Sequence, residues 1–441
     1  MDIKIVEPKS EYSGYNFSHM NKLPMLGSIY LGTILKQAGH NVSVYNEKLV
    51  EPKDLNADIL ILNSLTSGAN RAYALAERFK QQNPQGKVLM GGYHASFMPN
   101  EALKYADQVA IGEGENIILD MVNGKTTDRI VYGTPVQDLN TLPMPDYSLM
   151  EGLNYPKKRL KWLPLATSRG CPFDCTFCSV TQMLGRKYRA KDCSRVMKEL
   201  TNTRYKYIFF YDDNFTADND RTIDLLKKMK NNGITKRWVT QTRIDIANND
   251  KMLKLMSDTK CDMVFLGLES VNEETLKDYK KAQGLQQMKD AIRKIKDYGI
   301  QVWGGFVMGS DQDDKKTMQK TVDFCNETGI EVPQFSILTP FPGTKLFNDL
   351  VAQGRLLTKN WSLFDGWHVV FKPKKLSAYE LQEHSIDAFR QVWKNSKRLL
   401  RQITPAFRDL QNLKVAIEGL NVMKQVKKEN KRYLSFLSKQ I

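Results

Sequence analysis

The sequence lacks the long apolar runs and the dense cysteines that define membrane-spanning and disulfide-rich proteins. None of its apolar stretches approaches the ~18–20 residues that a transmembrane helix needs. The first ten residues, MDIKIVEPKS, contain no apolar segment of signal-peptide length, so nothing predicts export. Six cysteines among 441 residues are too few for a disulfide scaffold. We therefore expect reduced thiols, a cytoplasmic location, and a core divided among two or three domains.

Residues 1–135 predict a doubly wound, Rossmann-like α/β domain. Near-continuous apolar runs such as DILILN alternate with helical stretches such as RAYALAERFKQQ, which is typical of a parallel sheet covered on both faces. Ligands bind such sheets beyond the carboxyl ends of the strands. Those ends read NSLTSG (63–68), GGYHASFMP (91–99) and GEGE (112–115), where glycines would let the backbone approach a bulky ligand. The fingerprint G-x-G-x-x-G is missing after the first strand, which argues against NAD or FAD.

The second half of the chain predicts another parallel α/β unit. Residues 136–160 contain Pro143 and Pro145 and are expected to form a linker. After them, six strand candidates separated by helical patterns predict a partial (β/α)6 barrel over residues 161–355, with its site at the carboxyl ends of the strands. The strand candidates are LPLATSR, YIFFYDD, WVTQTRID, MVFLGLES, QVWGGFVMG and PQFSILTPF.

The last segment, residues 356–441, is expected to be mainly helical and basic. From Lys372 to Ile441 there are 16 lysines and arginines against 6 acidic residues, which supplies most of the net charge of +16. Apolar residues at roughly helical spacing between Leu399 and Leu420 predict amphipathic helices. These helices are either a solvated cap or a docking surface for an anionic partner, such as a membrane surface or an acidic redox protein. Nucleic acid is the least favoured partner, because no nucleic-acid motif is present.

Three cysteines lie close together in SRGCPFDCTFCSV, directly after the first barrel strand, at Cys171, Cys175 and Cys178. A structural zinc site takes four ligands, usually as two separated pairs, and no second pair exists in the sequence. Three thiolates in one loop suit a 4Fe-4S cluster that leaves one iron open to a non-protein ligand. The alternative is three incidental cysteines. The remaining thiols stand apart from one another, at Cys193, Cys261 and Cys325.

The spacing C-x-x-x-C-x-x-C, with Phe177 before the last cysteine and six βα units around it, resembles the radical S-adenosylmethionine superfamily. The resemblance implies that the open iron binds S-adenosylmethionine and that the reduced cluster splits it to a 5′-deoxyadenosyl radical, which abstracts hydrogen. It also places carboxylates of YDDNF near the amino group, Arg243 near the carboxylate and Glu269 near the ribose. Each position alone also fits a solvated barrel rim or a packing glycine. The implied S-adenosylmethionine-binding residues are Phe177, Asp212, Asp213, Gln241, Arg243, Glu269, Gly305, Val307 and Gly309.

The N-terminal half looks like the cobalamin-binding domain that precedes the barrel in one branch of this superfamily. The motif D-x-H-x-x-G, whose histidine ligates cobalt in other cobalamin proteins, is missing, and His94 does not fit its spacing. We expect His94 to be a loop residue that hydrogen-bonds the ligand or the backbone. The alternative is a domain that has lost cobalamin and serves only as structure. The cobalamin-binding candidates are Asn63, Ser64, Thr66, Gly91, Gly92, His94, Glu113, Gly114 and Glu115.

The resemblance implies a cobalamin-dependent radical enzyme that transfers a methyl group from methylcobalamin to an unactivated carbon. One alternative is a radical oxidoreductase or cyclase with the same cofactors, and another is a non-catalytic iron–sulfur redox sensor or interaction protein. A small flavodoxin or ferredoxin is the expected electron donor. The substrate is expected to be a small molecule or a lipid, with the basic tail making peripheral membrane contact. Trp361, Phe364, Trp367 and His368 would form either an apolar substrate wall or the core between barrel and tail.

Overall fold

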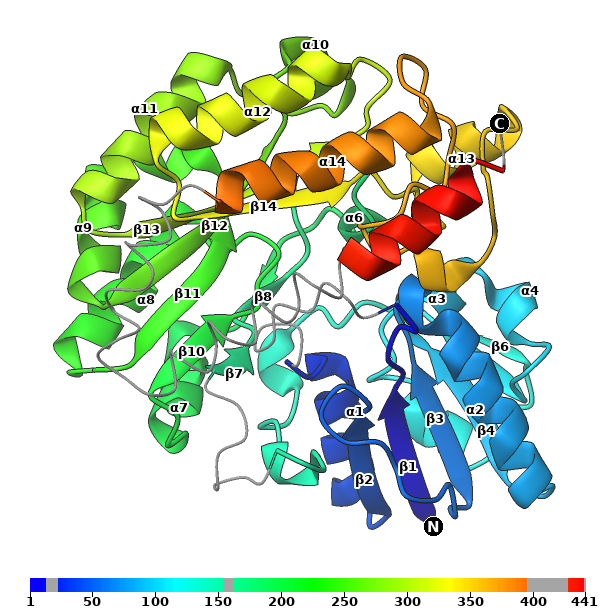
Figure 1. Cartoon of the computed structure of the whole chain (residues 1–441). Coiled ribbons are helices and arrows are strands. Elements are labelled where there is room, and N and C mark those ends of the chain that lie inside the picture. Colours follow the sequence, from blue (N-terminus) through cyan, green and yellow to red (C-terminus); the bar gives the residue numbers. More distant parts are fainter. Residues whose placement is uncertain (13–22, 154–161, 395–426, 440–441) are drawn as a thin grey trace.

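A computed structural model of the chain describes residues 1–12, 23–153, 162–394 and 427–439 (Figure 1). It contains two six-stranded parallel sheets, one in each half of the chain, which lie beside each other in Figure 1. The amphipathic helices predicted between Leu399 and Leu420 lie outside the described residues. Among the described residues, no helix combines the length and apolar character needed to span a membrane.

The N-terminal sheet has the strand order β2-β1-β3-β4-β5-β6, with every pair parallel. The order reverses between β1 and β3, which is the point where doubly wound sheets bind ligands. The strands are β1 (Asp2–Glu7), β2 (Asn41–Asn46), β3 (Ile59–Asn63), β4 (Lys87–Gly91), β5 (Gln108–Ile111) and β6 (Ile130–Tyr132). The helices are α1 (Leu26–Gln37), α2 (Ala69–Gln82), α3 (Gly92–Phe97), α4 (Pro99–Ala102) and α5 (Ile118–Val122), and η2 (Thr66–Gly68) is a 3-10 turn.

Both faces of this sheet are buried, as the continuous apolar strands predict. Leu60 and Leu62 of β3 pack into the core that α2 covers, whereas Ile59 and Ile61 pack into the core that α1 and α5 cover. Successive side chains of a strand point to opposite faces, so a strand covered on both sides needs apolar residues at every position. The short edge strand β6 carries Tyr132, whose surface is 70% exposed, and it was not predicted.

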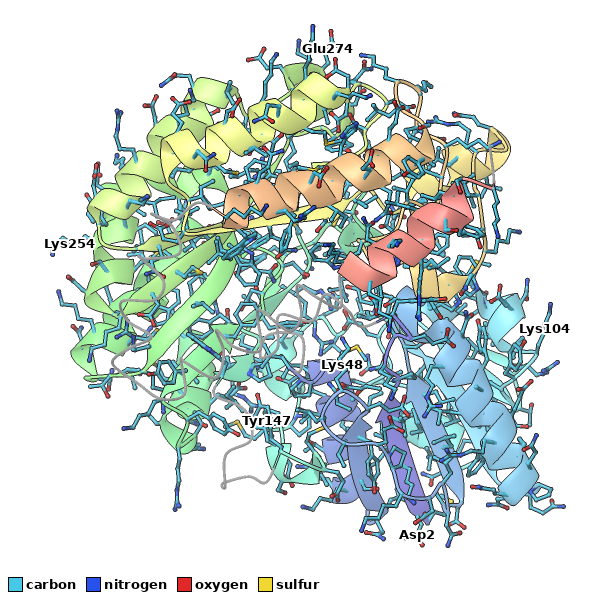
Figure 2. All side chains as sticks on the ribbon, viewed as in Figure 1. Asp2, Lys48, Lys104, Tyr147, Lys254 and Glu274 are labelled. Atoms are coloured by element: carbon cyan, nitrogen blue, oxygen red, sulfur yellow. The ribbon has the colours of Figure 1, made fainter. Side chains whose placement is uncertain are left out.

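The described part of the predicted linker packs against the N-terminal half. Its described part contains the 3-10 turns η3 (Leu139–Thr141) and η4 (Tyr147–Leu149). Leu139 and Met150 are buried in the α1 core, and Glu151 N donates to the Val44 carbonyl of β2 at 2.8 Å. Tyr147, labelled in Figure 2, donates its hydroxyl to the Pro164 carbonyl at 2.5 Å, which joins this segment to the second sheet.

The second sheet has the order β14-β13-β12-β11-β10-β7 and is the predicted partial barrel. Its helices follow the strands along the chain and pack beside one another around the sheet in Figure 1. The strands are β7 (Trp162–Leu165), β10 (Tyr207–Phe210), β11 (Arg237–Thr242), β12 (Cys261–Glu269), β13 (Gln301–Met308) and β14 (Val332–Ile337). The helices are α7 (Cys193–Asn202), α8 (Asn219–Asn231), α9 (Asp250–Asp258), α10 (Glu273–Asp278), α11 (Leu285–Asp297), α12 (Lys315–Thr328) and α13 (Lys345–Ala352), and η5 (Ile244–Asn248) is a 3-10 turn.

A small ribbon frames the three cysteines. Strands β8 (Ser168–Arg169) and β9 (Arg189–Ala190) pair antiparallel and enclose residues 170–188, which we call the cysteine loop. The loop contains the short helix α6 (Val180–Leu184). Because only two residues separate the end of β7 from the start of the ribbon, the cysteine loop lies at the carboxyl end of the barrel sheet.

The segment after the barrel ties the two halves together. Trp361 and Phe364, in and after η6 (Trp361–Leu363), are buried in the α2 core of the N-terminal half. A few residues later, Phe371 is buried in the barrel core, which α14 (Ala378–Trp393) also covers. Of the two interpretations of this aromatic segment, core packing therefore describes Trp361 and Phe364, although Phe364 also borders the cavity described next.

Candidate active site between the two sheets

A cavity of about 580 Å³ lies between the carboxyl ends of the two sheets. Its walls come from both halves of the chain, which places it where each fold by itself would bind a ligand. The N-terminal half contributes Gly27, Tyr30, Leu31, Asn63, Leu65, Thr66, Gly91, Gly92, Tyr93, Glu113, Gly114 and Glu115, among others. The barrel half contributes Ser168, Arg169, Ser179, Met183, Tyr211, Asp213 and Gln241, with Phe341 and Phe364 from the later segments.

Most of the cobalamin-binding candidates border this cavity. The exceptions are Ser64 and His94. His94 is buried in helix α3, where its Nε2 lies 3.0 Å from the Tyr73 hydroxyl and its ring packs on Trp361. His94 therefore lies in a helix and not in the predicted loop, and its imidazole is part of the core between α2, α3 and η6. The candidates that do border the cavity are Asn63, Thr66, Gly91, Gly92, Glu113, Gly114 and Glu115.

Gly91, the last residue of β4, and Gly92, the first residue of α3, line the cavity without side chains and are called the glycine floor. Gly92 has φ +86°, and a Cβ there would stand 2.3 Å from Asn63 Oδ1. Asn63 cannot simply move aside, because its Nδ2 donates to Ser28 Oγ at 2.8 Å. Packing therefore requires glycine at position 92. Because Gly91 and Gly92 present only backbone to the cavity, a bulky ligand can lie close to the strand ends there. This floor fits the cobalamin-type ligand that the resemblance implies.

The cysteine loop brings Cys171, Cys175 and Cys178 to the same edge as half-buried thiols. The loop turns tightly, with Cys178 N donating to the Cys175 carbonyl at 3.2 Å. Burial raises the pKa of Cys178 to about 11, so a metal would have to displace its proton. Within the described residues, no group of three histidine, cysteine or acidic side chains is arranged around a single metal ion. A 4Fe-4S cluster takes each thiolate on a different iron, so three thiols in one loop suit such a cluster.

Only one of the two adjacent aspartates faces the cavity. Asp212 is fully buried and accepts from Thr167 N at 3.1 Å and Thr167 Oγ1 at 2.8 Å. It thus fixes the corner between β7 and β8, and its predicted contact with S-adenosylmethionine does not match this position. Asp213 borders the cavity, and its Oδ2 accepts from Gly170 N at 3.1 Å. Burial raises the pKa of Asp213 to about 6.

The other barrel candidates divide in the same way. Gln241 borders the cavity, and the Arg243 guanidinium stacks 3.8 Å from the ring centroid of Phe173 in the cysteine loop. Glu269 is paired with Lys281 at 2.9 Å, and Phe177 packs on the ring of Tyr279. Arg243, Glu269, Phe177 and Val307 are not among the residues that border the cavity. The roles of these residues and of Gln241 toward S-adenosylmethionine stay predictions.

Packing explains Gly305 and Gly309, the two glycines predicted to bind S-adenosylmethionine. A Cβ on Gly305 would stand 2.5 Å from the ring of Phe265, and one on Gly309 would stand 2.5 Å from Leu381. Gly309 also has φ +103°, a conformation that favours glycine. Both positions therefore require glycine before any ligand is considered.

Sequence patterns missed two cavity residues that leave much of their surface open. Leu65 follows β3 and Tyr211 follows β10, with 46% and 42% of their surfaces exposed. A large apolar side chain in an open position at a strand end is a signal for ligand contact. Tyr211 begins the motif YDDNF, in which only the two aspartates were predicted to be site residues.

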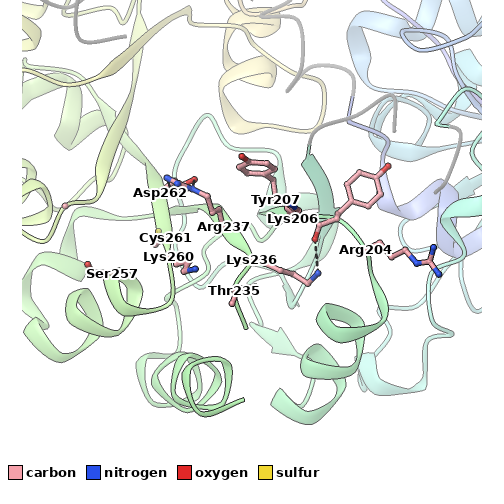
Figure 3. A pocket seen from close by; sticks show the side chains of 12 residues that line it. Arg204, Lys206, Tyr207, Thr235, Lys236, Arg237, Ser257, Lys260, Cys261 and Asp262 are labelled. Atoms are coloured by element: carbon pink, nitrogen blue, oxygen red, sulfur yellow. Dashed lines mark hydrogen bonds and ion pairs between the residues drawn. The ribbon is translucent and has the colours of Figure 1, made fainter. Parts of the chain in front are cut away.

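A second hollow, of about 640 Å³, lies at the amino ends of β10, β11 and β12, the opposite end of the barrel from the cysteine loop (Figure 3). It is basic, but several of its charges are already bonded. Arg237 pairs with Asp262 at 2.6 Å, and Lys236 Nζ donates to the carbonyls of Thr203 and Tyr205 at 2.7 and 2.8 Å. Its position and its satisfied groups separate it from the chemistry expected at the strand carboxyl ends.

Comparisons with known proteins decide the family. A model of the Radical SAM superfamily matches residues 165–325, and a model of the B12 binding domain matches residues 16–122. The chain is a radical SAM protein with a B12 binding domain. The resemblance drawn from the cysteine spacing is confirmed, and so is the fold class of a doubly wound domain followed by a partial barrel. The predicted set of a 4Fe-4S cluster, S-adenosylmethionine and cobalamin is the cofactor set of this family.

Curated relatives cover most of the chain. An uncharacterized methyltransferase of Pyrococcus horikoshii is 28% identical over 86% of this chain and 90% of its own. Bacteriochlorophyllide d C-12(1)-methyltransferase of Chlorobaculum tepidum is 29% identical over 90% and 88%. An anaerobic magnesium-protoporphyrin IX monomethyl ester cyclase of Rubrivivax gelatinosus is 24% identical over 83% and 73%. The relatives are enzymes, which supports the enzyme prediction over the sensor alternative.

A solved structure shares the fold. The cobalamin-dependent S-adenosylmethionine radical enzyme OxsB, determined with aqua-cobalamin bound, superposes with a TM-score of 0.69 at 16% identity. The match covers 99% of this chain and 72% of that one. At this identity the likeness establishes the arrangement of the two sheets and the segment after the barrel.

Proposed function

We propose that this radical SAM protein is a C-methyltransferase that acts on an apolar small molecule. The observation that carries the proposal is the cavity with the cysteine loop on one wall and Gly91 and Gly92 on the other. When bound, the cluster with S-adenosylmethionine supplies a radical that removes hydrogen from an unactivated carbon, and methylcobalamin supplies the methyl group. The chain's own part is to hold both sites against one space, so that substrate is positioned between them.

The side chains around this space suit an apolar substrate. Leu65, Tyr211, Phe341 and Phe364 border the cavity, and the first two leave 46% and 42% of their surfaces exposed. The charged groups on its walls are largely neutralised by one another, because Arg169 pairs with Glu113 and Glu115. The curated relatives named as methyltransferases of bacteriochlorophyllide, a large and mostly apolar ring system, agree with this class.

The decisive experiment is anaerobic reconstitution with iron, sulfide and hydroxocobalamin, followed by chemical reduction in the presence of S-adenosylmethionine and analysis of the nucleoside products. We expect both 5′-deoxyadenosine and S-adenosylhomocysteine. Cys175→Ala should reduce 5′-deoxyadenosine to background while cobalt content is retained, because the two sites lie in different halves of the chain. The matched control is Cys193→Ala, which removes a thiol at the start of α7, outside the cysteine loop. Absence of both products under reducing conditions would contradict the proposal.

A second candidate function is a radical cyclase or oxidoreductase with the same cofactors. It is favoured by the similarity to a magnesium-protoporphyrin IX monomethyl ester cyclase. The same experiment separates the two functions, because a cyclase would form 5′-deoxyadenosine without S-adenosylhomocysteine in proportion to product.

An acidic flavodoxin or ferredoxin as electron donor, and peripheral membrane contact through the basic tail, are further proposals. They are supported by the net charge of +16, most of it in the C-terminal segment. Reduction of the cluster by such a donor should slow as salt rises from 50 to about 300 mM, since screening weakens the attraction of opposite charges. Binding to anionic vesicles at low salt tests the membrane contact, and no binding would contradict it.

A further inference from the structure

Two arginines stand opposite each other at the base of the cysteine loop. In the antiparallel ladder of β8 and β9, Arg169 lies directly opposite Arg189. Side chains directly opposite in an antiparallel pair lie on the same face, and like charges there repel. The Arg189 side chain is 2% exposed and that of Arg169 is 15% exposed, so water screens this repulsion poorly. The ribbon therefore needs a compensating charge from outside itself.

That charge comes from the N-terminal half. Glu113, which follows β5, accepts from Arg169 Nη1 at 2.9 Å and from Arg189 Nη1 at 3.1 Å. Glu115 accepts from Arg169 Nη2 at 2.6 Å. Both carboxylates are nearly buried, and two negative charges balance two positive ones. Although burial by itself would raise it, the pKa of Glu113 is lowered by the hydrogen bond from Arg189 and the charge of Arg169.

Glu113 is itself held firmly. Its Oε2 also accepts from Val136 N at 2.9 Å, and Gly133 packs so closely that a Cβ there would overlap the Glu113 carbonyl. Arg189 makes further bonds to the carbonyls of Val136 at 2.6 Å and Leu184 at 3.1 Å. The network thus runs from the N-terminal sheet through the ribbon into the cysteine loop, which contains Leu184.

We propose that Glu113 and Glu115 are positioning residues for the iron–sulfur cluster: from the cobalamin-binding half, they hold the two arginines that close the base of the cysteine loop. They touch no cluster atom and act through Arg169 and Arg189. Because Arg169, Glu113 and Glu115 also border the cavity, the same bonds fix the loop relative to the cobalamin site. The inference rests on the proposed function only in taking the three cysteines as cluster ligands.

The test is hydrogen exchange of the full chain without metal or cobalamin, so its result does not depend on methyl transfer. In Glu113→Gln, which keeps the shape but removes the charge, amides of residues 170–188 should exchange about 10-fold faster or more. Strands β12 and β13 should keep their rates within about twofold. Glu115→Gln should give a smaller and more local increase in the exchange rates, because the bond between Arg189 and Glu113 remains. The matched control is Glu327→Gln, which breaks an exposed pair with Lys289.

A second readout follows the cluster itself. After reconstitution, the electron paramagnetic resonance spectrum of the reduced Glu115→Gln variant should change less on addition of S-adenosylmethionine than that of the wild type. Glu115→Gln also covers the case in which Glu113→Gln does not fold. Unchanged exchange over residues 170–188 with an unchanged spectrum would overturn the proposal, and so would faster exchange spread equally over β12 and β13.

Discussion

The backbone N–H of Gly170 donates to the carboxylate of Asp213 at 3.1 Å. This bond joins the residue immediately before Cys171 to the end of β10, so the barrel fixes the start of the cysteine loop. Gly170 has φ +84°, and a Cβ there would stand 2.5 Å from the Lys187 carbonyl near the other end of the loop. The two ends of the loop can therefore approach each other only if position 170 is glycine.

Gly170→Ala should weaken iron retention roughly tenfold, because the loop ends must separate and the cysteines move with them. The matched control is Gly185→Ala in the same loop, with a similar φ of +79° and nothing within 4 Å of the added Cβ. Iron and sulfide are measured after reconstitution and desalting. An equal loss of iron in both variants would show that backbone strain, and not the contact with Lys187, governs the effect. Wild-type iron content in Gly170→Ala would contradict the prediction.

Gly92→Ala should weaken cobalamin binding by about tenfold or more, because the new Cβ would displace Asn63, which borders the cavity, from its bond to Ser28. An absorbance titration with hydroxocobalamin measures the affinity. Gly39→Ala is the control, because its φ of +89° is similar and its surroundings are open. Wild-type affinity in Gly92→Ala would contradict the placement of cobalamin on this floor.

The fold followed from sequence because its strands have strong local signals. A strand buried on both faces, such as β3, is apolar at every position, and the polar residues at its end mark the ligand edge. The edge strand β6 has three residues and an exposed Tyr132, so no such run exists there. Similarly, the linker was expected from its prolines, although its apolar residues pack on α1.

The site was predictable to the level of strand ends, but not to the level of side-chain direction. Asp212 and Asp213 are adjacent, and only the turn after β10 decides that the first is buried and the second borders the cavity. His94 lies on a helix whose inward face could not be assigned from one turn of sequence. The pair of Arg169 and Glu113 is separated by 56 residues, a distance at which no local pattern carries information.

Tyr211→Ala should lower turnover roughly tenfold with little change in stability. Its side chain is 42% exposed, so its removal breaks few core contacts and stability should change little. It also borders the cavity, so its removal takes away a contact with the substrate. We expect the thermal midpoint to stay within about 2 °C of the wild type. Tyr132→Ala is the control, because that tyrosine is 70% exposed and lies on β6. Unchanged turnover in Tyr211→Ala would remove this residue from the site.

Glu7 at the end of β1 gives the stability of the protein a pH dependence that can be tested. Its carboxyl is buried, accepts from Met25 N at 2.9 Å through Oε1, and has no partner for Oε2 among the described residues. Burial raises its pKa from 4.5 to about 8, although Ser28, Met25, Lys48 and Asn46 lower it in part. The folded state therefore holds this proton more tightly than the unfolded state does.

A raised folded-state pKa means that stability is fully present below pH 4.5 and declines as pH rises toward 8, by up to about 1.4 kcal/mol per pH unit. Glu7→Gln keeps an acceptor for Met25 and cannot ionise, so it should remove this slope. Urea unfolding should show that, from pH 5 to pH 8, the free energy of unfolding of the variant rises relative to that of the wild type by roughly a few kcal/mol. The exposed Glu327→Gln serves as control, and parallel pH profiles for wild type and Glu7→Gln would show that this carboxyl ionises without cost in the folded state.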